Sequence, residues 1–125
     1  MSPKRPRVLV ADDHLDVTTA VCRLLATDCD VVGTVADGAA LLEATQRLRP
    51  DIVVLDVNIP NVHGLEACRQ ITAVNPETKV IVFTAMIDEV VRERSFEVGA
   101  SAFVSKLTSG DLLMAIKRLW AGPDS

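Results

Sequence analysis

The residues best suited to chemistry are three carboxylates, a hydroxyl and an amine that stand at the ends of short apolar segments: Asp12, Asp13, Asp56, Thr84 and Lys106. Three carboxylates brought together repel one another unless a cation lies among them. Their oxygens suit a hard ion such as Mg2+, which also binds phosphate oxygens. A lysine and a hydroxyl can stabilise a phosphoryl group. The set therefore indicates metal-assisted phosphate chemistry.

Five apolar, β-branched segments occur along the chain, and four of them directly precede these residues. Strands are predicted at residues 8–11, 31–35, 52–55 and 80–83, with a weaker fifth at 102–105. Continuous apolar runs are typical of strands covered on both faces. The intervening segments show helical spacing, except that residues 89–98 are more polar and less periodic. The sequence thus predicts five strand-helix units.

Local signals mark where the helices begin and end. Asp37 can cap the second helix, and Thr108 followed by Asp111 resembles a capping box before the last helix. Pro50 and Pro76 follow helices that they cannot extend.

Repeated strand-helix units predict an α/β fold with a parallel sheet, right-handed crossovers and helices on both faces. Ligands of such sheets bind beyond the carboxyl ends of the strands. For Asp13 and Asp56 to share one ion, the first and third strands must be neighbours, because adjacent strands lie about 4.8 Å apart. The predicted architecture is a doubly wound, flavodoxin-like five-stranded sheet of order 2-1-3-4-5.

Length and composition limit the possible classes of protein. The 125 residues fit one domain, with residues 1–6 and 122–125 expected to be flexible ends. A net charge of −4 disfavours direct nucleic-acid binding. Three cysteines without Cys-x-x-Cys spacing indicate free thiols, and no apolar run is long enough for a signal peptide or a membrane span. We expect a cytoplasmic protein without membrane contact.

The ordered set of strand-end motifs resembles the signature of the response-regulator receiver family of two-component signalling. The matching motifs are Asp12-Asp13, Asp56-Val57-Asn58-Ile59-Pro60 with Gly64, Thr84-Ala85, and Lys106. They extend over most of the chain. Asp12-Asp13-His14 and the stretch 102–106 followed by Leu112 resemble the LuxR/NarL-type subgroup.

The resemblance implies that Asp56 accepts a phosphoryl group from a sensor histidine kinase with Mg2+ as cofactor. It places the metal on Asp12, Asp13, Asp56 and the backbone carbonyl of Asn58.

It also implies that Lys106, Thr84 and the backbone of Ala85 bind the phosphoryl group. Thr84 and Phe103 would then switch conformation and alter the face formed by the fourth helix, fifth strand and fifth helix. A DNA-binding output domain absent from this chain, and a homodimer formed on phosphorylation, are further implications. The chain would be a self-assisting phosphoacceptor in transcription regulation, not an enzyme.

Two departures from the family pattern bear on the site. Leu107 stands where proline often follows the lysine, which leaves open whether the Lys106-Leu107 bond is cis or trans. His63 stands before Gly64, where an acidic or small residue is frequent, and is expected to be a solvated loop residue. Neither His63 nor His14 is assigned a catalytic role.

Other functions compete with this one. Asp12 or Asp13 alone could simply cap the first helix. A haloacid-dehalogenase-like phosphatase also uses a strand-end aspartate, but it needs a second acid where this chain has Asn58. A flavodoxin-like module needs a phosphate cradle where this chain has Asp12 and Asp13. A receiver-like switch that is never phosphorylated is the remaining alternative.

Overall fold

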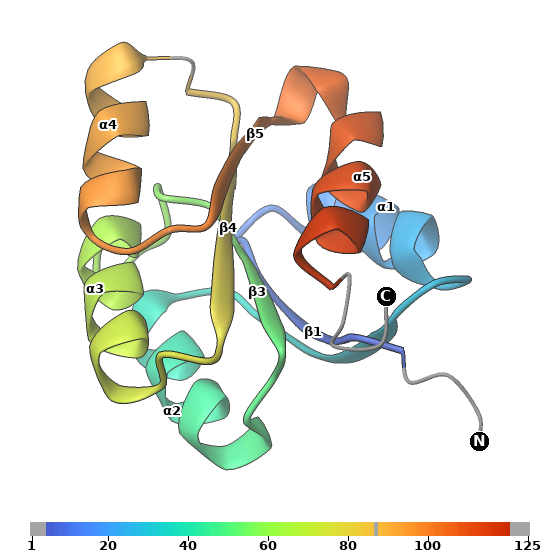
Figure 1. Ribbon diagram of the computed structural model, residues 1–125, viewed down its shortest axis with the longest axis horizontal. Helices are drawn as coiled ribbons and strands as arrows, with labels where there is room; N and C mark the ends of the chain where they lie inside the picture. The colour runs from blue at the N-terminus through green and yellow to red at the C-terminus, as the bar shows by residue number, and fades with distance from the viewer. Residues whose placement is uncertain (1–4, 87, 121–125) are drawn as a thin grey trace.

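The computed structural model describes residues 5–86 and 88–120. Strands and helices alternate along the chain (Figure 1), in the order β1 (Arg7–Ala11), α1 (Leu15–Leu25), β2 (Asp30–Val35), α2 (Gly38–Leu48), β3 (Ile52–Leu55), α3 (Gly64–Val74), β4 (Lys79–Thr84), α4 (Glu89–Glu97), β5 (Ala102–Ser105), the 3-10 turn η1 (Lys106–Thr108) and α5 (Gly110–Leu119). The predicted strands and helices are all present, with shifts of one residue or so at some of their ends.

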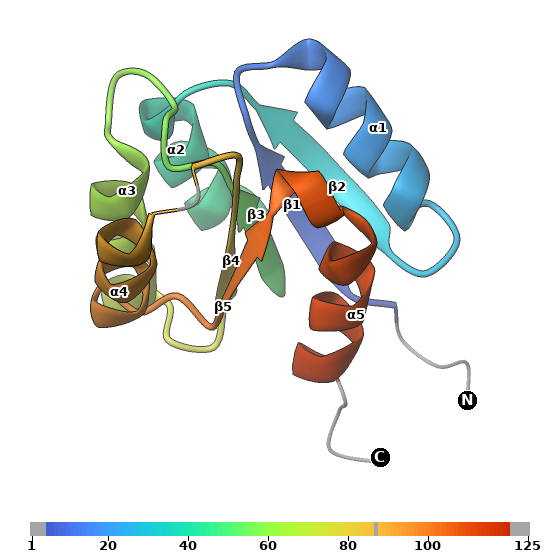
Figure 2. The ribbon, with the colours of Figure 1, turned by 90° about the horizontal axis from the view of Figure 1, so that it is seen from above.

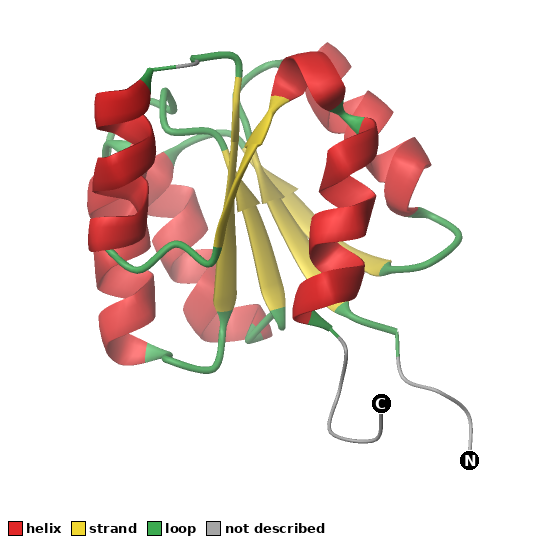
Figure 3. Cartoon of the chain, turned by 45° about the horizontal axis from the view of Figure 1, so that its top comes forward, coloured by secondary structure: helices red, strands yellow, loops and turns green. Residues whose placement is uncertain are grey.

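The five strands form one parallel sheet of order β2-β1-β3-β4-β5. This confirms the predicted order, in which β1 lies beside β3. Helices α1 and α5 cover one face of the sheet, and α2, α3 and α4 cover the other (Figures 2 and 3). Every strand therefore ends at the same edge as its neighbours, which is where the polar residues were expected to meet.

The core consists of two apolar clusters, one on each side of the sheet. Alternate residues of a strand point to opposite faces. Leu9 and Ala11 accordingly belong to the cluster under α2 and α3, whereas Val8 and Val10 belong to the cluster under α1 and α5. Both faces are buried, which explains why the strands are continuous apolar runs without polar alternation.

The predicted cap of the second helix is confirmed, and that of the last helix is wrong. The Asp37 side chain accepts a hydrogen bond of 2.7 Å from the backbone N–H of Ala40. At the last helix, Ser105 accepts from the N–H of Leu107 and begins a 3-10 turn, so α5 starts only at Gly110. The Thr108 position lies inside that turn because Ser105 offers an earlier hydrogen-bond acceptor.

The described residues also decide the peptide geometry after Lys106. They contain no cis peptide bond, so the bond to Leu107 is trans. Of the expected flexible ends, residues 1–4 and 122–125 lie outside the described residues. Arg5 donates hydrogen bonds to the carbonyls of Ala26 and Cys29 and pairs with Asp30. None of the described helices is both long and apolar enough to cross a bilayer.

The start of α2 packs directly on the loop that follows β3. Gly38 donates its backbone N–H to the carbonyl of Pro60 at 2.9 Å. A Cβ atom on Gly38 would lie 2.0 Å from the carbonyl oxygen of Val62, which is far closer than atoms can approach. Only glycine lets this helix support the loop that leads away from Asp56.

Replacing this glycine should therefore be costly. Gly38→Ala forces backbone apart and should lower the free energy of unfolding by about 2 kcal/mol. Gly110→Ala is a matched control, because a Cβ there meets nothing within 4 Å and alanine favours a helix, so it should raise that free energy by about 0.5 kcal/mol. Urea unfolding of both variants measures the difference, and equal effects would contradict the packing described.

Candidate functional site

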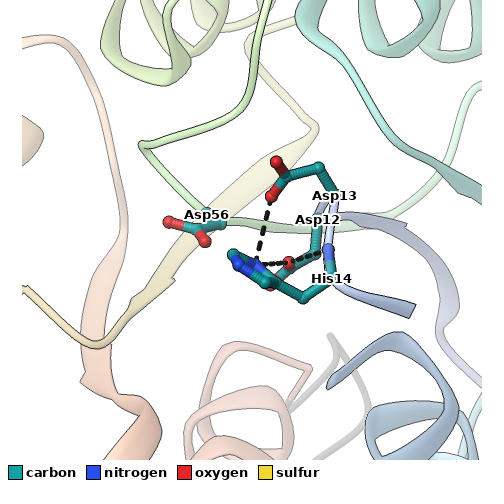
Figure 4. A group of neighbouring side chains, drawn as sticks. All are labelled: Asp12, Asp13, His14 and Asp56. Carbon is teal, nitrogen blue, oxygen red and sulfur yellow. Dashed lines mark hydrogen bonds and ion pairs between the residues drawn. The ribbon is translucent and has the colours of Figure 1, made fainter. Parts of the chain in front are cut away.

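The two buried aspartates lie side by side because their strands are neighbours. Asp12 follows β1 and Asp56 follows β3, and the preceding residues Ala11 and Leu55 are paired in register. The backbone N–H of Asp56 donates to the carbonyl of Ala11 at 2.9 Å, and that of Asp12 donates to the carbonyl of Val35 at 3.0 Å. Sheet hydrogen bonding thus continues into the site and holds the backbone of both aspartates, whose side chains are drawn in Figure 4.

Lys106 joins the two buried aspartates. Its Nζ lies 2.6 Å from Oδ2 of Asp12 and 2.8 Å from Oδ2 of Asp56. The side chains of the lysine and the two aspartates are only 13%, 3% and 4% exposed. The sequence predicted this lysine to reach the site from the end of β5, and the structure places it there.

The charge on Lys106 is secured by its two partners. Burial alone lowers the pKa of this lysine, since it disfavours the charged form. Hydrogen bonds to Asp12 and Asp56 and the charges of both carboxylates more than offset burial, so the pKa is raised above its ordinary value. Lys106 is therefore a permanent cation throughout the neutral range.

The acidic groups are grouped closely enough to bind a metal ion. Ligand atoms from Asp12, Asp13, His14 and Asp56 all lie within 4.8 Å of one another. The single positive charge of Lys106 does not neutralise three carboxylates, so the group still attracts a cation. Oxygen donors of this kind fit Mg2+. The donor set is thus consistent with the expected metal.

Asn58 lies two residues beyond Asp56 in an exposed position of the same loop. Its backbone N–H donates to Oδ1 of Asp56 at 3.1 Å. Because Lys106 binds Oδ2, both oxygens of Asp56 are held in the orientation seen. Asn58 therefore contacts the proposed acceptor through its own backbone.

Thr84 ends β4 and is almost fully buried beside Ser105 of β5. Its hydroxyl oxygen accepts a hydrogen bond of 3.2 Å from the backbone N–H of Met86. Ala85, the next residue, is exposed. The Thr84 hydroxyl thus links the end of β4 to the loop that follows it.

Phe103, in the middle of β5, is half-buried against the apolar cluster beneath α2 and α3. It is paired in register with Val82 of β4. The ring is therefore neither fully exposed nor fully packed in the conformation described.

Both histidines have local roles that the sequence interpretation did not assign. His63 is exposed, as expected, and its Nδ1 accepts from the N–H of Leu65 as the N-cap of α3. His14, not Asp12 or Asp13, occupies the N-cap position of α1. Its ring turns back onto both aspartates, and its position next to Asp13 was the only signal of this.

Comparison with known proteins identifies the family. The family model for the response regulator receiver domain matches residues 8–117. The chain is 36% identical over 120 residues to the response regulator GacA of Pseudomonas viridiflava, which covers 93% of this chain and 56% of that protein. It is 39% identical to a protein-glutamate methylesterase/protein-glutamine glutaminase of Koribacter versatilis, covering 86% of this chain and 30% of that protein.

Solved structures agree in both fold and sequence. A LuxR-family two-component response regulator from Aurantimonas sp. SI85-9A1 has a TM-score of 0.89 and 30% identity, with 97% of this chain and 92% of that chain covered. The BeF3-activated DrrB receiver domain has a TM-score of 0.85 and 31% identity, with 95% and 100% covered. The parallel α/β fold together with the family match defines a receiver domain of two-component signalling. The chain belongs to the response-regulator receiver family, and it spans about half the length of the GacA relatives that it matches.

Removing Lys106 should reveal the repulsion between the buried carboxylates of this site. Lys106→Met leaves two buried carboxylates without their cation and should lower the free energy of unfolding by about 3 kcal/mol. The exposed Lys79 provides a control, since Lys79→Met should change that free energy by less than about 0.5 kcal/mol.

The effect of pH on this difference follows from the raised pKa. A lysine whose folded pKa is raised contributes stability that is complete below its unfolded pKa and is lost as pH rises through the folded pKa. The wild-type advantage over Lys106→Met should be constant from neutral pH to mildly alkaline pH and should fall only under strongly alkaline conditions. Denaturant unfolding at several pH values measures it, and a decline already near neutrality would contradict the assignment.

Proposed function

We propose that this domain accepts a phosphoryl group on Asp56 from a phosphohistidine of a sensor kinase, and that the modified domain signals through its α4-β5-α5 face. The observation that carries the proposal is Lys106, whose Nζ bridges the buried carboxylates of Asp12 and Asp56. Two buried acids sharing one lysine, beside a third acid, are a costly arrangement for stability alone. The arrangement is suited to binding and stabilising an added anionic group.

Asp56 supplies the nucleophile. A carboxylate oxygen forms a bond to phosphorus while the bond from phosphorus to the histidine nitrogen breaks, and the nitrogen keeps the electron pair. Lys106 can move towards the negative phosphoryl oxygens and still remain paired with Asp12. The N–H of Asn58, which donates to Oδ1, helps keep the attacking group oriented.

Asp12, Asp13, Asp56 and the backbone carbonyl of Asn58 would hold Mg2+. When bound, the ion neutralises charge on the phosphoryl oxygens as they approach the carboxylates. The carboxylates of this chain supply the hard oxygen donors that the ion needs, and Asp13, the most exposed of the three, leaves the site open to solvent. Access from solvent is what a phosphodonor also requires.

Thr84 and Phe103 would transmit the change. The hydroxyl of Thr84 accepts a hydrogen bond from the N–H of Met86 and can at the same time donate its own proton to a phosphoryl oxygen. If Thr84 moves towards the phosphoryl group, this hydrogen bond draws the loop after β4 with it, and the half-buried ring of Phe103 can pack further inward. A local negative charge then alters a surface at a distance.

Helix α4 is suited to such a change because few of its side chains anchor it. Among its described residues only Ser95 is buried, while Val90 and Phe96 are exposed. An element with few buried apolar contacts has alternative positions close in free energy. The α4-β5-α5 face is therefore the proposed output surface, and a homodimer on this face is one possible product of phosphorylation.

The output is proposed to be transcription. The GacA relatives are response regulators, and one relative is a putative transcriptional regulator from Pseudomonas aeruginosa that is 35% identical over 118 residues. A DNA-binding domain in the full-length protein would bind nucleic acid, with this acidic domain as its control element. Family membership favours a cytoplasmic phosphoacceptor over the phosphatase alternative, and a lack of turnover of a chromogenic phosphate ester would support this choice.

The acceptor can be identified by mass. Acetyl phosphate with Mg2+ should add one phosphoryl group to the wild-type chain, and Asp56→Asn should abolish the gain because an amide is a poor nucleophile. Asp16→Asn, which changes an exposed aspartate outside the metal group, is the control and should label normally. Intact-mass spectrometry measures the gain.

Three outcomes of that experiment would contradict the proposal. Equal labelling of Asp56→Asn would place the phosphoryl group elsewhere. Full labelling of the wild type in excess chelator would exclude a role for the metal. Absence of any labelling, with the fold intact by circular dichroism, would favour the receiver-like switch that is never phosphorylated.

The switch can be followed by hydrogen exchange. Beryllofluoride, a phosphoryl mimic, should change amide exchange in α4 and in β5 around Phe103 as well as in the loops at Asp56. Thr84→Val, which keeps the size but removes the hydroxyl, should confine the change to the Asp56 loops. An identical exchange pattern in α4 for the two proteins would contradict the role given to Thr84.

A further inference from the structure

The ring of His14 makes contact with both aspartates that precede it. Its Nδ1 lies 3.1 Å from Oδ1 of Asp12 and 3.1 Å from Oδ1 of Asp13 (Figure 4). The other oxygen of Asp12, Oδ2, is the one that pairs with Lys106. The lysine and the histidine therefore approach different oxygens of the same carboxylate, and both oxygens of Asp12 are in use.

The local fold does not require this imidazole. His14 is the N-cap residue of α1, yet its side chain makes no capping hydrogen bond. The backbone N–H of His14, not the ring, donates to Oδ1 of Asp12 at 2.8 Å. The His14 side chain is 64% exposed. The ring is therefore not packed in the apolar core and can reorient towards an added ligand.

The distances match those between ligands of one metal ion. Two donor atoms that are each about 2.1 Å from a metal lie about 3.0 Å apart at a right angle and about 3.4 Å apart at the tetrahedral angle. The separations of Nδ1 from the two carboxylate oxygens, both 3.1 Å, fall between these values. The same 3.1 Å separation lets the ring hydrogen-bond Asp12 when no cation is bound.

Resting on the proposed function, we infer that His14 is a ligand of the acidic site for borderline divalent cations such as Zn2+ and Co2+. Mg2+ is hard and takes oxygen donors, whereas imidazole suits the later first-row metals. The nitrogen donor would give this site an affinity for Zn2+ and Co2+ beyond that of Asp12, Asp13 and Asp56 alone, and it would leave Mg2+ binding unchanged. His14 is thereby a specificity-determining residue for the cation.

The cysteines are poor competitors for these metals. Burial raises the pKa of Cys68 to about 12 and also raises the pKa of Cys29, so both thiols stay protonated at neutral pH. Cys22 is partly exposed and its pKa is raised as well. Metal bound through sulfur would in any case reveal itself in Co2+ spectra as an intense thiolate charge-transfer band, whereas binding at His14 would not.

The test compares two histidine variants of the full chain at one fixed pH. His14→Asn keeps an amide that can hydrogen-bond the aspartates and cap α1, but removes the imidazole. His63→Asn is the matched control, since it removes the other imidazole and keeps a capping acceptor for α3. Calorimetric titration with Zn2+ and with Mg2+, and visible absorption with Co2+, measure binding, and urea unfolding without metal confirms that both variants fold.

His14→Asn should weaken Zn2+ and Co2+ binding about tenfold or more, while His63→Asn should have no effect and Mg2+ binding should be equal in all three proteins. Unchanged Zn2+ and Co2+ affinity in His14→Asn would overturn the inference and reduce the ring to a hydrogen-bond partner. An equal loss for Mg2+ and Zn2+ would also overturn it, since the loop would then be generally disturbed. Failure of the wild type to bind Mg2+ would instead count against the proposed function.

Discussion

Like charges held together at one edge of the sheet constrain the rest of this structure. Asp12 and Asp56 are both buried, and each would raise the free energy of the folded state if it stood without a cation. Lys106 supplies one positive charge to the pair from the end of β5, which lies two strands from β3 and three strands from β1 in the sheet. The fold has to bring together residues far apart in the sequence, and the parallel sheet does so because every strand ends at the same edge.

The helical layer formed by α2, α3 and α4 is unevenly anchored near this edge. On the side of α2 and α3, glycines allow the backbone to pack tightly under the site: Gly38 meets Val62, and a Cβ on Gly64 would lie 2.4 Å from the Cα of Val57. This close packing at Gly38 and Gly64 holds the loop that carries Asn58 in place. Helix α4 lies on the same side of the sheet but is held by few buried side chains. A tightly packed region near Asp56 therefore lies beside a helix that can move.

Much of this arrangement could be predicted from the sequence. The requirement that Asp13 and Asp56 share an ion placed β1 beside β3, and the apolar runs showed that both faces of the sheet are covered. The polar character of α4 also appears in the structure, where Ser95 is its one buried residue among those described. These predictions succeed because they depend on charge repulsion and burial, which act over the whole domain.

Other features depend on local competition between hydrogen bonds, which the sequence does not resolve. Ser105 accepts from Leu107 and starts a 3-10 turn, and this displaced the cap expected at Thr108. Arg49 ends α2 in the left-handed region with φ of 47°, where glycine or asparagine is usual. The direction of the His14 ring was equally hidden, since an exposed side chain has several rotamers of similar energy.

Phosphorylation of the Asp56 carboxylate, the group paired with Lys106, can be tested chemically. Borohydride reduces an acyl phosphate to an alcohol, so treating the labelled protein with borohydride converts the acceptor aspartate to homoserine. Peptide mapping by tandem mass spectrometry then reads its position directly. If Asp56 is the acceptor, homoserine appears at position 56. Homoserine at position 12 or 13, or a stable phosphoryl group that borohydride does not remove, would contradict this role of Asp56.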